Sequence, residues 1–138
     1  MGALHVFLCV MLVFAVGCVT TNATMLGTAT VRRASTNESV VKFYRTAEQV
    51  PGRYEEIALL HSKGDSENTD ESQMYESMRR KAAEIGANGV ILEALVEPSV
   101  EAKIAAKSLG VLPDREGRAV AIYVYPPGEG PEGVTENP

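Results

Sequence analysis

The sequence predicts an α+β fold, in which a small mixed β-sheet of about four strands is covered on one face by one main helix. Segments rich in β-branched and aromatic residues recur along the chain, and one segment between them carries apolar residues at helical spacing. These segments follow one another in the order strand, strand, helix, strand, possible helix, strand. That order favours a helix packed on one face of a mixed sheet. We expect the folded domain over residues 39–125.

The first two strands are predicted on either side of a turn. Residues 40–44 are β-branched and aromatic, and the sequence Gln-Val-Pro-Gly at 49–52 is typical of a turn. Residues 54–61 follow, with Ile57 and Leu59 expected on one face and Ala58 and Leu60 on the other. A strand that is apolar on both faces is expected inside its sheet rather than at an edge. A polar loop should then extend to Thr69.

The main helix is predicted over residues 71–85. Asp70 is placed to cap its first turn, and Gln73 stands where a capping box requires it. Gly86 is a suitable residue just beyond the helix, because glycine adopts the left-handed backbone conformation without strain. The apolar stripe consists of Met74, Tyr75, Met78, Ala82 and Ile85.

Two further strands and one ambiguous segment complete the domain. Residues 90–96 are a third strand, and residues 119–125 alternate between two faces in the manner of a fourth. Residues 100–109 suit a short second helix, ended by Gly110 and kept from resuming by Pro113. A pair of short strands is the alternative for this segment.

The N-terminal residues resemble a bacterial lipoprotein signal. The block 3–16 has no Asp, Glu, Lys or Arg. At about 1.5 Å per residue it would span roughly 21 Å, which is shorter than a ~30 Å hydrocarbon core. The run Ala-Val-Gly at 15–17 then leads into Cys18, as in a lipobox. We therefore predict a signal peptide over 1–17 and lipidation of Cys18.

Two alternatives remain for this segment. One is an ordinary signal peptide cleaved near Gly17 or Ala23, and the other is a retained N-terminal anchor helix. A leucine is more usual where Ala15 stands, and residues 1–5 contain no Lys or Arg. N-myristoylation is excluded, because that motif needs Ser or Thr where Val6 stands.

The two flanks of the predicted domain have few residues to bury. Residues 18–38, rich in Thr, Ser, Asn and Ala, are expected to be a lipid-anchored tether, with a short strand over 29–33 as an alternative for that part. Residues 126–138 are rich in Pro, Gly and Glu and are predicted to be a disordered tail.

Composition and charge exclude several classes of function. The formal net charge of −5 argues against nucleic-acid binding, which requires a concentrated basic surface. Of the two cysteines, Cys9 lies in the signal segment, so the mature chain would hold Cys18 alone and no internal disulfide. Packing must then supply the stability of the domain.

No combination of residues favours catalysis or a cofactor. The chain has no Gly-x-Ser-x-Gly elbow, and His61 is the single histidine beyond the signal segment. His61, Asp65 and Glu67 are weak candidates for a metal. A calcium loop starting at Asp65 is unsuitable, because its sixth position needs glycine and Asp70 stands there. We expect a protein that is not an enzyme and has no cofactor.

The segment 78–92 resembles the helix-to-strand signature of small bacterial YbjQ/RcsF-like domains. Its sequence is MRRKAAEIGANGVIL, and the pattern Pro-x-x-Tyr-x-x-Ile-Ala at 51–58 is also similar to that family. The resemblance covers roughly residues 40–96. It implies a helix over a small sheet, and for the lipoprotein members a sensing role through protein contacts. The mature chain lacks the paired cysteines of the RcsF-like sensors.

The expected function is that of a non-enzymatic envelope lipoprotein. Its partners would be the lipid bilayer, through acylated Cys18, and another envelope protein. Tyr123 and Tyr125 share one face of the last strand and are candidates for a partner contact. Val19 follows the cysteine where Asp marks inner-membrane retention in enterobacteria, so the resemblance implies the outer membrane, facing the periplasm. The alternative is a small-ligand or metal-binding module that uses His61 and the acidic loop 65–71.

Overall fold

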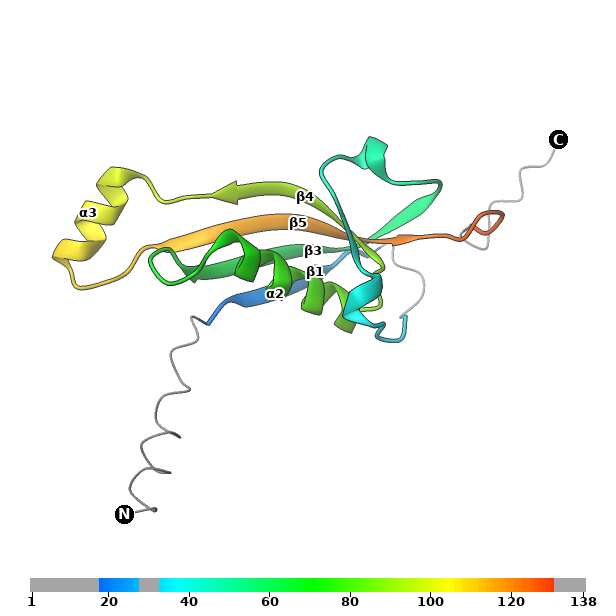
Figure 1. Cartoon of the computed structure of the whole chain (residues 1–138), viewed down its shortest axis with the longest axis horizontal. Helices are drawn as coiled ribbons and strands as arrows, with labels where there is room; N and C mark the ends of the chain where they lie inside the picture. Colours follow the sequence, from blue (N-terminus) through cyan, green and yellow to red (C-terminus); the bar gives the residue numbers. More distant parts are fainter. Residues whose placement is uncertain (1–17, 28–32, 131–138) are drawn as a thin grey trace, which may run out of the picture.

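The computed structural model describes residues 18–27 and 33–130, and the predicted signal segment 1–17 lies outside these ranges. Within them the fold is α+β, as predicted: five strands form one mixed sheet, and one main helix lies on one of its faces (Figure 1). The strands are β1 (Thr20–Met25), β2 (Lys42–Tyr44), β3 (Tyr54–Asp65), β4 (Gly89–Val96) and β5 (Asp114–Val124), and the helices are α2 (Glu71–Glu84) and α3 (Val100–Ser108).

The strand order across the sheet is β1-β3-β5-β4-β2. The pairs β1–β3, β3–β5 and β4–β5 are antiparallel, and β2 runs parallel to β4. The long strands β3 and β5 are inside the sheet, which confirms the position expected for residues 54–61. The short β2 pairs with only the first three residues of β4, from Gly89 to Ile91.

The first strand corrects the prediction of a tether over residues 18–38. Residues 20–25 form β1, which pairs with β3 along its whole length. The sequence did not predict this strand because its composition is polar. Its inward-facing residue, Thr21, is a buried polar residue where an apolar one would have marked a strand. Its Oγ1 donates to Ser62 Oγ at 3.1 Å and lies 2.7 Å from Ser77 Oγ, so the buried polar group is satisfied. The short strand expected at 29–33 lies almost entirely outside the described residues.

The two interior strands are longer than predicted. Strand β3 continues to Asp65, through residues expected to be a loop, and β5 already begins at Asp114. Their added residues pair with each other, with Ser62 opposite Gly117 and Lys63 opposite Glu116. The added residues are mostly charged, as at Lys63 and Glu116, or very small, as at Ser62 and Gly117. They therefore show no alternation of apolar and polar residues that sequence analysis could detect.

A β-bulge changes the faces predicted for β3. The register with β5 shifts between Glu56 and Ala58. As a result Ile57 and Ala58 are both buried, whereas Leu59 is 44% exposed on the opposite face. The expectation that Ile57 and Leu59 share a face was therefore wrong, because an extra residue in one strand reverses the alternation that follows it.

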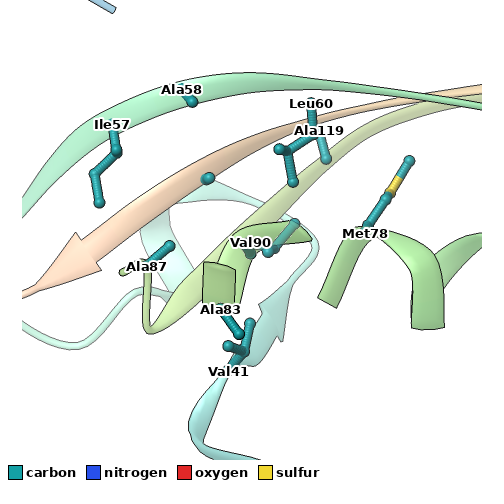
Figure 2. Close-up of a cluster of buried hydrophobic side chains, with 11 residues drawn as sticks. Val41, Ile57, Ala58, Leu60, Met78, Ala83, Ala87, Val90 and Ala119 are labelled. Atoms are coloured by element: carbon teal, nitrogen blue, oxygen red, sulfur yellow. The ribbon is translucent and has the colours of Figure 1, made fainter. Parts of the chain in front are cut away.

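The helix α2 forms as its sequence predicts. Asp70 accepts a hydrogen bond from the Gln73 backbone, and the Gln73 side chain accepts one from the Asp70 N–H, which completes the capping box. Met78 and Ala83 of α2 pack against Leu60, Val90 and other buried residues (Figure 2). A smaller apolar cluster lies on the other side of the sheet and consists of Val50, Ile91, Val120 and Ile122.

The segment 100–109 forms the short helix α3 and not the alternative pair of short strands. Ser99 caps α3 by accepting a hydrogen bond from the Ala102 N–H, yet α3 buries none of its residues. It connects β4 to β5 and projects beyond their ends (Figure 1).

At the other end of the domain, residues 126–130 of the predicted disordered tail form a turn, in which Glu129 N–H donates to the Pro126 carbonyl at 3.0 Å. The rest of that tail lies outside the described residues.

Gly86→Ala is expected to destabilise the domain by more than about 2 kcal/mol. Gly86 has a φ of 80°, and an added Cβ would lie 2.5 Å from Arg33 Cβ and 2.7 Å from the Ala34 carbonyl oxygen. Gly52→Ala is the matched control, because Gly52 has the same φ but no atom near its added Cβ. Its cost should be about 1 kcal/mol of backbone strain alone. Equal losses in urea unfolding would contradict the close contact at Gly86.

Candidate functional site

Cys18 is a free, exposed cysteine at the start of the folded domain. One residue separates it from β1, whose first residue Thr20 pairs with Lys63. Lys63 in turn pairs with Glu116, and Glu116 with Val96. Cys18 therefore lies at the end of the sheet where β4 ends and β5 begins. No helix within the described ranges has the length and apolar character needed to cross a bilayer.

The candidate metal ligands are not brought together. His61 and Asp65 lie four residues apart on one strand, a separation of about 13 Å, which is too far for one ion. The Asp65 carboxylate accepts hydrogen bonds from the backbone N–H groups of Glu67 (2.7 Å) and Asn68 (3.2 Å), and these bonds lower its pKa. Asp65 thus closes the turn before α2. No cluster of three possible metal ligands occurs among the described residues.

His61 instead belongs to a charged row on the face opposite α2. Its Nε2 lies 3.4 Å from Glu116 Oε2, and Lys63 Nζ lies 3.0 Å from Glu116 Oε1. Lys63, followed by His61, holds the pKa of Glu116 below its ordinary value. These partly exposed groups link β3 to β5 in the part of the sheet that the sequence did not predict.

A polar cluster built on Arg33 lies at the opposite end of the sheet from Cys18. Arg33 Nη2 lies 3.0 Å from Glu55 Oε2 and donates to the Tyr125 hydroxyl at 3.1 Å. The Tyr125 hydroxyl donates to the same Glu55 oxygen at 2.7 Å. The Arg33 guanidinium also covers the Tyr123 ring at 4.1 Å from its centre, an arrangement that favours a cation–π attraction.

Sequence reasoning missed Arg33 because nothing local marks it. Tyr123 and Tyr125, the candidates for a partner contact, have ring centres 5.3 Å apart in an edge-to-face arrangement, and Arg33 covers the Tyr123 ring. A hollow of about 770 Å³ borders this cluster and is also lined by Lys42 and Asn88. Since Glu55 pairs with the Arg33 charge, the cluster fixes the segment after residue 32 against the sheet.

A second hollow lies between α2 and the open edge of β4. Its volume is about 350 Å³, and it is lined by residues 92–95 of β4 and by Tyr75 and Met78 of α2. Arg45, the residue directly after β2, also lines it. Because β2 ends its pairing at Ile91, the backbone of β4 beyond that residue has no strand neighbour on this side among the described residues.

This groove has the form of a site for an extended peptide. A sheet edge with unpaired N–H and C=O groups can add a strand, and apolar side chains beside it can hold alternate residues of that strand. Leu92 and Leu95 supply the apolar wall on the strand side. Sequence reasoning recognised the strand but not its open edge, since pairing with β2 depends on residues far away in the chain.

Tyr125→Phe is expected to reduce the free energy of unfolding by about 1 kcal/mol at neutral pH, through loss of the hydrogen bond to Glu55. That bond raises the pKa of Tyr125 in the folded state. Its contribution is therefore complete below the ordinary tyrosine pKa of about 10 and is lost as pH rises through the raised value. The difference between variant and wild type should shrink in strongly alkaline buffer.

Tyr123→Phe is the matched control for this measurement. It keeps the ring that Arg33 covers, and the described residues give its hydroxyl no hydrogen-bond partner. Urea unfolding at a series of pH values compares the two variants. An equal loss in both, or a Tyr125→Phe effect that is constant with pH, would contradict the role of the Glu55 contact.

Comparison with known proteins gives one distant structural likeness. No family model matches the chain, and no curated protein sequence matches it. The crystal structure of the Francisella virulence factor FvfA is similar to it, with a TM-score of 0.48 and 15% identity, over 73% of this chain and 96% of that one.

Proposed function

We propose that this protein is a non-enzymatic lipoprotein of the bacterial envelope, anchored through acylated Cys18, whose domain binds an extended segment of another envelope protein. The anchor would place it in the outer membrane, facing the periplasm. Partner binding would serve envelope sensing or assembly. The observation that carries partner binding is the unpaired edge of β4 beside α2.

The position of Cys18 supports the anchor. The residue is exposed and unpaired, and the chain enters the sheet only one residue later. Acylation would therefore meet no steric obstacle from the domain. The preceding apolar block ends in a lipobox-like run at 15–17, which is the sequence context that lipidation requires.

The geometry of the β4 edge supports an extended protein segment as the partner. A peptide added parallel or antiparallel to residues 92–96 would continue the sheet from the point where β2 turns away. Main-chain hydrogen bonds would supply affinity, and the partly exposed side chains of Tyr75, Leu92 and Leu95 would select the partner's side chains. The metal-binding alternative lacks comparable support, because His61 and Asp65 are separated along β3.

Radiolabelled palmitate is expected to enter the full-length protein in a Gram-negative host, and Cys18→Ser should abolish the label, since a hydroxyl at this place does not accept the lipid. Thr20→Ser, two residues away, is the control that should keep it. Intact mass measurement of the N-terminus separates the alternatives. An unacylated mature chain starting near Cys18 or Thr24, or a chain that retains residues 1–17, would refute the anchor.

A photo-crosslinking amino acid at position 94 should capture one defined envelope protein in intact cells. Ala94 is exposed and lines the β4 groove, so the probe would face a bound strand without disturbing the core. The same probe at the exposed Ala47, away from the groove, is the matched control. The adduct is read by mass spectrometry of membrane fractions.

The substitution Ala94→Glu should eliminate the adduct formed by a second probe at position 93 while leaving the melting temperature unchanged, because a charged side chain on the sheet edge opposes strand addition. Ala47→Glu should change neither quantity. If positions 94 and 47 capture the same proteins equally, the β4 edge is not the partner site.

A further inference from the structure

The segment that joins β4 to β5 carries a concentration of exposed apolar side chains. Helix α3 buries no residue, and the loop after it is equally open. Soluble domains rarely present so many large apolar side chains together without a binding purpose. The exposed fractions are 68% for Val100, 65% for Ile104, 79% for Leu109, 57% for Val111 and 43% for Leu112.

This apolar segment, residues 100–112, lies at the same end of the sheet as Cys18. It follows Val96 at the end of β4, and the register carries Val96 to Glu116, Lys63 and Thr20. Figure 1 shows α3 projecting beyond the sheet at the end where β1 begins. Three strand spacings of about 4.8 Å separate β1 from β4, so the base of α3 is roughly 14 Å to the side of the chain that leads to Cys18.

The distance between Cys18 and the sheet is short. A single residue, Val19, stands between the cysteine and β1, and each extended residue reaches at most about 3.6 Å. A lipid on Cys18 would hold this end of the sheet within about 10 Å of the headgroups. Any apolar side chain that projects from this end is then within reach of the bilayer.

Two lysines of α3 are placed to meet a membrane surface, although the helix also carries Glu101 in its first turn. Val100 and Ile104 are four residues apart and therefore share one side of the helix. Lys103 and Lys107 flank that stripe at neighbouring helical positions, where a lysine can lay its hydrocarbon stem along the interface and keep its ammonium at the phosphates. Lys103 is half exposed and has Glu97 as its ion-pair partner, at 3.6 Å.

We propose that residues 100–112 are a second membrane contact, which inserts its apolar side chains into the headgroup region of the same bilayer that holds the lipid on Cys18. The inference rests on the proposed lipid anchor. A two-point attachment would fix the sheet end-on against the membrane. The Arg33 end would then be presented away from the lipid, and the β4 groove would lie on the side of the domain near its membrane-facing end.

The chain contains no tryptophan, so one introduced tryptophan reports alone. Leu109→Trp places it in the proposed contact, and Pro127→Trp, exposed at the opposite end of the sheet, is the control. Both full-length lipoproteins are reconstituted in phosphatidylethanolamine–phosphatidylglycerol vesicles with brominated acyl chains. Leu109→Trp should emit at shorter wavelength than the control and lose most of its emission to bromine quenching. Ile104→Glu in the Leu109→Trp background should reverse both effects.

The outcomes separate this inference from the anchor. Intact mass measurement first establishes whether Cys18 is acylated, and an unacylated chain refutes the anchor and the inference together. An acylated protein whose Leu109→Trp emission matches that of Pro127→Trp refutes the membrane contact alone. Emission that shifts only after addition of envelope proteins also overturns it, because the segment would then bind protein.

Discussion

The close approach of α2 to the sheet at Gly117 is the constraint on which the rest of the structure depends. A Cβ on this residue would lie 2.6 Å from Met78 Cε and 3.4 Å from Met74 Cε, so a larger residue here would require the end of the Met78 side chain to move. The neighbouring inward positions of β3 and β5 are also small or apolar, and Ala58, Ala119 and Ala121 are almost fully buried. These small residues bring the helix near enough to exclude water from the core.

The placement of α2 decides which surfaces stay open. The helix lies mainly over β3 and β1, where Ser77 meets the buried Thr21 hydroxyl at 2.7 Å. It therefore leaves β4 less covered, and the hollow between Tyr75 and residues 92–95 is the consequence. The short β2 adds to this effect, because among the described residues the second half of β4 has a strand neighbour only on its β5 side. Close packing of α2 over β1 and β3 and an open groove beside β4 thus have the same origin.

The two ends of the sheet differ in chemistry. One carries the free thiol of Cys18 and the exposed apolar segment 100–112, whereas the other carries the cluster in which Arg33 joins Glu55 and the two tyrosines. A lipid at the first end would direct the second away from the bilayer, with the unpaired part of the β4 edge beside the first end. The proposed anchor, membrane contact and partner groove are therefore compatible in one orientation, since none of them occupies the surface that another needs.

The sequence by itself determined the α+β class and the main helix, including its capping box at Asp70 and the glycine that follows it. It also indicated a short helix as one of two options for residues 100–109. These features depend on contacts within a few residues, so local patterns reveal them. Strand β1, the bulge at Ile57, the position of Arg33 and the open edge of β4 were decided by tertiary structure alone. Each depends on which distant segment lies alongside: Thr21 is buried only because Ser62 and Ser77 satisfy its hydroxyl, and Arg33 is held only because Glu55 and Tyr125 meet it from two other parts of the chain.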